Sequence, residues 1–156
     1  MARATGSRPS DHRRMGTQLD HRSTALVVSE DEGLRANLAE WLEDDGIDVM
    51  VCPGPRRPHY SCIGSRGQPC PLIHGADLVL VDLHPESGQL IDSTSRNELV
   101  NHYRQLGRRV VAIVDGDTTL DLPATSGLAV VGRLAERGTL VGTVRDVLAQ
   151  VDKVPV

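Results

Sequence analysis

The chain has 156 residues, which is enough for one domain with a full hydrophobic core and too few for two domains of ordinary size. Aromatic residues make up 2% of it and phenylalanine is absent, so the core must be aliphatic, and base-stacking surfaces for single-stranded nucleic acid are not expected. The net charge of -4 is unevenly spread, because residues 1–22 hold five arginines against two aspartates. We predict that residues 1–22 form a disordered basic tail, with at most weak contact to nucleic acid, and that residues 23–152 form the domain.

The sequence also restricts the compartment and the class of protein. No apolar run approaches the ~20 residues needed to cross a bilayer, and no secretory signal is seen near the N-terminus. We therefore expect a cytoplasmic protein that does not bind membranes, in which the three cysteines start as thiols. Nucleophile-elbow, Walker and dinucleotide motifs are missing from the sequence, so we expect no enzyme.

The first half of the predicted fold begins with a short apolar strand, Ala25–Val28. Ser29, with an acid three residues later, has capping-box spacing and is predicted to cap a helix that runs to about Asp45. Apolar side chains recur on one stripe of this helix, and a glycine follows as its stop signal. A second strand is predicted at Asp48–Val51.

Residues 52–75 break the alternation of strands and helices. They hold five of the nine prolines and all three cysteines, and show no helical period. We predict a long irregular loop here, in place of a helix, between the second and third strands. The loop is an insertion that needs a brace or a function to be kept in a compact domain.

The run that ends at Asp82 is the most informative in the chain. Its apolar residues, Leu78–Val81, do not alternate with polar ones, as expected for a parallel strand covered on both faces. This strand delivers the carboxylate of Asp82 to its C-terminal end, where open α/β sheets place ligand and catalytic groups. Asp82 is therefore the best candidate among the acids for chemistry.

The remaining elements complete the pattern. We predict a helix over Asn97–Leu106, strands over Arg109–Val114 and Leu128–Val131, and a last helix over Glu136–Val151. Five apolar strands that alternate with helices predict an α/β fold with a doubly wound, five-stranded parallel sheet.

With these elements in order, the chain resembles a response-regulator receiver domain, with flavodoxin-like topology. The best segments are Leu26 to Asp31, Ala76 to Leu83, and Arg133 to Leu148. The resemblance implies that Asp82 is the phosphoacceptor, that Glu30 and Asp31 form an acidic pocket for Mg²⁺, and that Arg133 is the phosphate-side cation. It also implies a protein partner, either a histidine kinase or an output regulator, or a second copy of the chain.

Several positions depart from the receiver pattern. The first acid of the usual pair is Ser29, the lysine is Arg133, and the proline after it is Leu134. The hydroxyl residue expected after the fourth strand is replaced by Val114 or Asp115, and the aromatic switch position is Val130. These departures favour an atypical, stand-alone signalling module that acts through protein–protein interaction over one driven by phosphorylation of Asp82.

The Cys-rich loop suggests an alternative function. Cys52, Cys62, Cys70 and His74 supply three thiols and one imidazole, which suit a tetrahedral Zn²⁺ site and equally an iron–sulfur cluster. Their spacing is that of neither a zinc finger nor a ferredoxin, and a disulfide or unliganded thiols remain open. The alternative is therefore a metal- or iron–sulfur-binding redox sensor.

Overall fold

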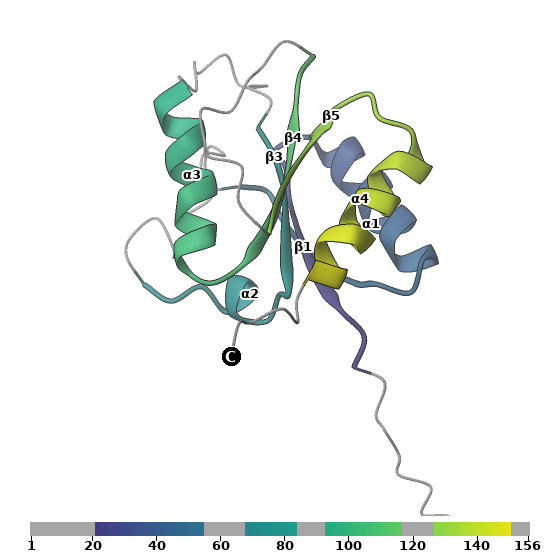
Figure 1. Cartoon of the computed structure of the whole chain (residues 1–156), viewed down its shortest axis with the longest axis horizontal. Coiled ribbons are helices and arrows are strands. Elements are labelled where there is room, and N and C mark those ends of the chain that lie inside the picture. The colour runs from purple at the N-terminus through teal and green to yellow at the C-terminus, as the bar shows by residue number, and fades with distance from the viewer. Residues whose placement is uncertain (1–20, 55–67, 84–92, 117–126, 151–156) are drawn as a thin grey trace, which may run out of the picture.

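The computed structural model describes residues 21–54, 68–83, 93–116 and 127–150, the side chains of 93–96 excepted. Within these residues five parallel strands form one sheet, in the order β2-β1-β3-β4-β5 (Figure 1). The strands are β1 (Thr24–Val28), β2 (Asp48–Cys52), β3 (Leu78–Asp82), β4 (Arg109–Val114) and β5 (Leu128–Gly132). The helices are α1 (Glu32–Asp44), α2 (Pro71–His74), α3 (Ser93–Gln105) and α4 (Arg137–Ala149). The predicted doubly wound parallel sheet is confirmed, and the predicted tail lies outside the described residues except for its last two.

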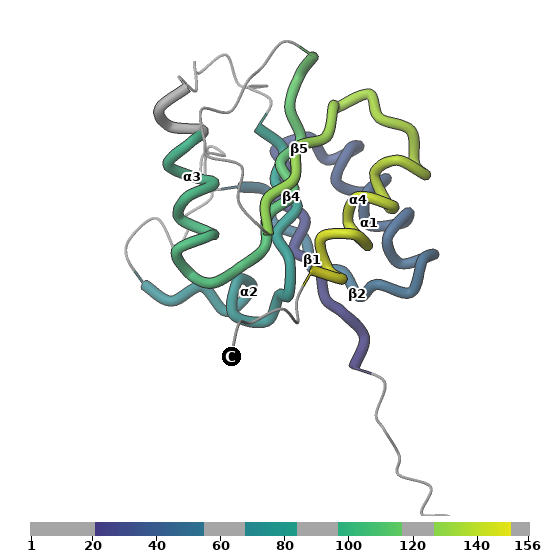
Figure 2. Tube along the Cα trace, in the orientation of Figure 1, coloured from purple at the N-terminus to yellow at the C-terminus, as the bar shows by residue number. Residues whose placement is uncertain are grey.

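The helices cover both faces of the sheet. α2 and α3 lie on one face, and α1 and α4 lie on the other (Figures 1 and 2). Side chains of one strand alternate between the two cores: Ala25 and Val27 pack on the α1 and α4 side, and Leu26 and Val28 on the α2 and α3 side. Because both sides of the pleat are buried, the central strands need apolar residues at every position. Among the described residues, no helix is both long and apolar enough to cross a bilayer.

The strand order fixes where a site can form. β1 lies between β2 and β3. The second strand of the chain therefore pairs with one edge of β1, and the third strand pairs with its other edge. In register, Val28 lies opposite Val81, and Asp82 lies opposite Ile113 of β4. The C-terminal ends of β1 and β3 are therefore neighbours at the topological switch point, where α/β sheets bind ligands.

The predicted cap of the first helix is wrong. The N-cap of α1 is Asp31, whose side chain accepts a hydrogen bond from the Leu34 N–H at 3.0 Å. Ser29 still belongs to the sheet, because its N–H donates to the Cys52 carbonyl at 3.1 Å, and it is 1% exposed. Strand pairing thus extends one residue past β1 and delays the helix, which the capping-box spacing alone could not reveal.

The predicted loop contains a helix, and two helix boundaries shift. α2 is four residues long and begins with Pro71 at a position that needs no N–H donor, while Ile73 packs into the core. One turn is too short to show a helical period in the sequence. α3 begins at Ser93, four residues before the predicted Asn97, and α4 ends at Ala149. Residues 55–67 of the predicted loop lie outside the described residues.

Two glycines give a matched test of backbone conformation. Gly46 ends α1 with φ of 83°, whereas Gly142 lies inside α4, and an added Cβ would meet no atom within 4 Å at either position. Gly46→Ala is expected to destabilise the fold by about 1 kcal/mol, since L-residues are strained at positive φ. Gly142→Ala is expected to stabilise it by about 0.5–1 kcal/mol. Urea unfolding of both variants checks this, and equal effects would contradict the assigned backbone at Gly46.

Candidate functional site

The site is centred on the carboxylate of Asp82. β3 carries this residue to the C-terminal edge of the sheet, where its side chain is 2% exposed. The Ser29 hydroxyl, at the end of β1, donates to Asp82 Oδ2 at 2.8 Å. A carboxylate this deeply buried needs hydrogen bonds and a counter-charge to stay ionised.

Arg133 supplies the counter-charge. One of its guanidinium nitrogens, Nη2, lies 2.8 Å from Asp31 Oδ2 and 4.0 Å from Asp82 Oδ2. Its backbone N–H donates to the Val114 carbonyl at 2.8 Å, which continues the pairing of β4 and β5 past the last residue of β5. The side chain is 17% exposed. The sheet thus holds this cation between two acids, one at the N-cap of α1 and one at the end of β3.

Ser29 and Asp31 are bonded to each other as well. The Asp31 N–H donates to Ser29 Oγ at 3.1 Å, so the same hydroxyl accepts one hydrogen bond and donates another to Asp82. A second guanidinium, that of Arg35 on α1, donates to the Ser29 carbonyl at 2.6 Å. The first turn of α1 and the ends of β1, β3 and β5 are therefore joined in one polar network around Asp82.

The structure brings together three of the four residues predicted from the receiver resemblance: Asp82, Asp31 and Arg133. The side chain of Glu30 lies beside Gly54, which follows β2. A Cβ added to Gly54 would lie 3.8 Å from Glu30 Cγ. Arg35 was missed as a part of the site, and Ser29 was placed at the first acid position of the receiver pattern without being predicted as a site residue. Ser29 ends an apolar strand next to the strand of Asp82, which is a usable signal, whereas nothing local in the sequence singles out Arg35.

The predicted metal-ligand set is only partly assembled. Cys52 lies opposite Val28 at the C-terminal end of the sheet, and its sulfur accepts from the Gly54 N–H at 3.4 Å. His74 precedes the N-terminal end of β3, about a strand's length away, so Cys52 and His74 do not meet at one ion. Within the described residues, no group of three or more His, Cys, Asp or Glu could hold a metal ion. Cys62 lies outside those residues, so its role stays a prediction.

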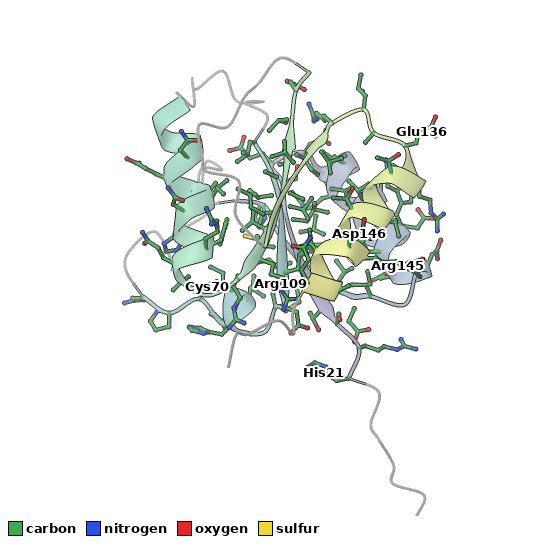
Figure 3. The ribbon with its side chains drawn as sticks, in the orientation of Figure 1. His21, Cys70, Arg109, Glu136, Arg145 and Asp146 are labelled. Carbon is green, nitrogen blue, oxygen red and sulfur yellow. The ribbon has the colours of Figure 1, made fainter. Side chains whose placement is uncertain are left out.

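Cys70 and His74 do share one cavity. It lies between α2 and α3, has a volume of about 230 Å³, and is lined by Gln68, Pro69, Cys70, Ile73, His74, His102 and Leu106. Cys70 is the N-cap residue of α2 and lies near the lower end of α3 (Figure 3). This cavity is on the opposite edge of the sheet from Asp82, so the two candidate sites are separate.

Comparisons with known proteins bear on the fold. No family model matches the sequence, and no curated protein matches it. Solved structures do match. The signal receiver domain of a signal transduction histidine kinase from Syntrophus aciditrophicus has a TM-score of 0.60 at 13% identity, over 84% of this chain and 93% of that one. A response regulator receiver domain protein from Methanospirillum hungatei has a TM-score of 0.59 at 12% identity, over 83% and 96%. The chain has the receiver fold.

The receiver fold is shared with proteins of different description. A putative pilus assembly-related protein from Burkholderia pseudomallei has a TM-score of 0.57 at 17% identity, over 82% of this chain and 90% of that one. At such identities the likeness establishes the fold and leaves function to the site. The function is therefore argued from the network of Ser29, Asp31 and Arg133 around Asp82.

Proposed function

We propose that the chain is a receiver-like signalling module that acts by binding a protein partner without depending on phosphorylation of Asp82. The observation that carries the proposal is the state of Asp82: its side chain is 2% exposed, with Oδ2 bonded to Ser29 and next to Arg133. Attack on a phosphoryl donor requires a reachable carboxylate oxygen and cations placed to offset the charge of the phosphate. A buried, already engaged carboxylate is better suited to holding the ends of β1, β3 and β5 together.

A surface for a partner lies next to this network. Val130 on β5 is 50% exposed, and Leu134, in the turn after it, is 98% exposed. Large apolar side chains with this much exposure, close together in the chain, favour a protein contact. Leu134 directly follows Arg133, so a protein partner that binds Leu134 lies next to the backbone that positions the Arg133 guanidinium.

Phosphorylation is tested directly with acetyl phosphate and Mg²⁺. Intact-mass spectrometry of the wild type is expected to show no phosphate adduct, and Asp82→Ala, which lacks the acceptor, is the matched blank. An adduct on the wild type that is missing from Asp82→Ala would overturn the phosphorylation-independent part of the proposal.

Partner binding is tested by photocrosslinking in cells. A photoreactive residue replaces Leu134 in the wild type and in Asp82→Ala, and the control carries it at Gln105, which is exposed at the end of α3. The same crosslinked protein is expected with both position-134 chains and not with the control. Loss of the product in Asp82→Ala would show that Asp82 controls binding, and identical products from positions 134 and 105 would rule out this surface.

One observation favours a second candidate function, a metal or redox sensor. Cys70, His74 and His102 line one cavity, and thiols and imidazoles are ligand types that Zn²⁺ takes, although as placed these three do not form a group that could hold an ion. Metal analysis and an absorption spectrum of protein purified without air, beside Cys70→Ser and Cys62→Ser, test this. Stoichiometric zinc or iron that is lost in Cys70→Ser would support the sensor, and metal-free wild type would exclude a resident metal.

A further inference from the structure

A cation already lies among the acids at the carboxyl edge of the sheet. The same nitrogen of Arg133 is 2.8 Å from Asp31 Oδ2 and 4.0 Å from Asp82 Oδ2. A guanidinium stays protonated at any pH a cell reaches, so this charge is permanent. Its backbone is fixed on both sides, by the Arg133 N–H bond to Val114 and by the bond from the Ala135 N–H to the Gly132 carbonyl at 3.0 Å.

The donor set of the site does not fit Mg²⁺. That ion requires near-octahedral oxygen ligands at 2.0–2.1 Å and takes one or two carboxylates together with water. Both oxygens of Asp31 are engaged, Oδ1 by the Leu34 N–H and Oδ2 by Arg133. Asp82 Oδ2 receives the Ser29 hydroxyl hydrogen, at the position where the receiver pattern has a first acid. A divalent ion would have to displace these donors and sit beside a guanidinium of the same sign.

The charges of the network balance without a metal. Two aspartates, Asp31 and Asp82, are matched by two arginines, Arg133 between them and Arg35 against the Ser29 carbonyl. Of the described residues, two further acids lie near this edge: Glu30, whose side-chain stem is beside Gly54, and Asp115, which directly follows β4. Within the network itself, the negative charge that would recruit Mg²⁺ is therefore offset by the two arginines.

We infer that Arg133 is the built-in cation of this site, holding the place that Mg²⁺ would take, so that the native site does not bind Mg²⁺. This inference goes beyond the proposed function and is independent of it, because it concerns how the carboxylates are neutralised and not which protein binds Leu134. It also explains what Arg133 does in a site with a hydroxyl at the first acid position: it bridges two carboxylates that would otherwise repel each other.

The test is a titration of the full chain with Mg²⁺ and with Mn²⁺, followed by thermal unfolding and by Mn²⁺-induced NMR line broadening. The wild type is expected to show no saturable shift in melting temperature and no selective broadening near Asp82. Arg133→Met, which keeps an unbranched side chain of about the length of the arginine stem and removes its charge, is expected to gain saturable stabilisation by both ions. Arg133→Met combined with Asp31→Asn is expected to lose that gain.

Arg133→Gln is a second neutral variant and is expected to gain saturable stabilisation by both ions, as Arg133→Met does. Saturable Mg²⁺ binding by the wild type would overturn the inference whatever the variants do. A folded Arg133→Met that gains no affinity for either ion would also contradict it, because some feature other than the guanidinium would then exclude the metal. Should Arg133→Met fail to fold, the wild type and Arg133→Gln decide the question, since Mg²⁺ binding by the wild type, or no gain of binding by a folded Arg133→Gln, contradicts the inference.

Discussion

Ser29→Asp is expected to destabilise the fold by about 3–5 kcal/mol in the absence of divalent cations and to recover part of this loss in Mg²⁺. The substitution puts a carboxylate where the Ser29 hydroxyl now donates to Asp82 Oδ2 at 2.8 Å. Two buried carboxylates at that distance repel each other, and a divalent ion relieves the repulsion. Urea unfolding of the wild type and the variant, each with and without Mg²⁺, measures both effects.

Ser29→Ala is the control for the lost hydroxyl. It leaves Asp82 without one hydrogen bond, at an expected cost of about 1–3 kcal/mol, and adds no charge, so Mg²⁺ should not change its stability. If Ser29→Asp were as stable as the wild type without Mg²⁺, the assigned contact between Ser29 and Asp82 would be contradicted. If Ser29→Ala responded to Mg²⁺ as strongly as Ser29→Asp, the added carboxylate would not be the cause of the response.

Leu80→Ala is expected to cost about 2–5 kcal/mol of the free energy of unfolding. Leu80 is at the centre of β3, is 0% exposed, and belongs to the core on the α1 and α4 side of the sheet. The truncation removes buried methyl groups and leaves a cavity that neighbouring strands cannot close, because β3 is paired on both sides. Chemical unfolding monitored by circular dichroism gives the change.

The matched control is Leu134→Ala, the same substitution at a side chain that is 98% exposed. It removes no buried area from the folded chain, so its unfolding curve is expected to coincide with that of the wild type. A Leu80→Ala variant as stable as Leu134→Ala would mean that β3 is not the central buried strand. A destabilised Leu134→Ala would place Leu134 in a folded contact and weaken its assignment to a partner surface.

The strands and the location of Asp82 could be predicted from the sequence alone. Uninterrupted runs such as Leu78–Val81 have few alternatives to a strand buried on both faces, and parallel strands force their carboxyl ends onto one edge. The local sequence pattern predicted the ends of helices and strands, and very short helices, less well. Ser29 has the spacing of a helix cap but remains paired with Cys52, and α2 is a single turn with no period to detect.

The polar network around Asp82 could be recognised only from the tertiary structure. Arg133 and Asp31 are far apart in the chain, and only the order of the strands brings the turn after β5 against the start of α1. The same order sends Cys52 to one edge of the sheet and His74 to the other, so these two members of the ligand set predicted from the sequence are separated in space. Hydrophobic periodicity reports which residues are buried, because burial repeats along a strand or helix. Contacts between strand ends depend on topology, which no local pattern encodes.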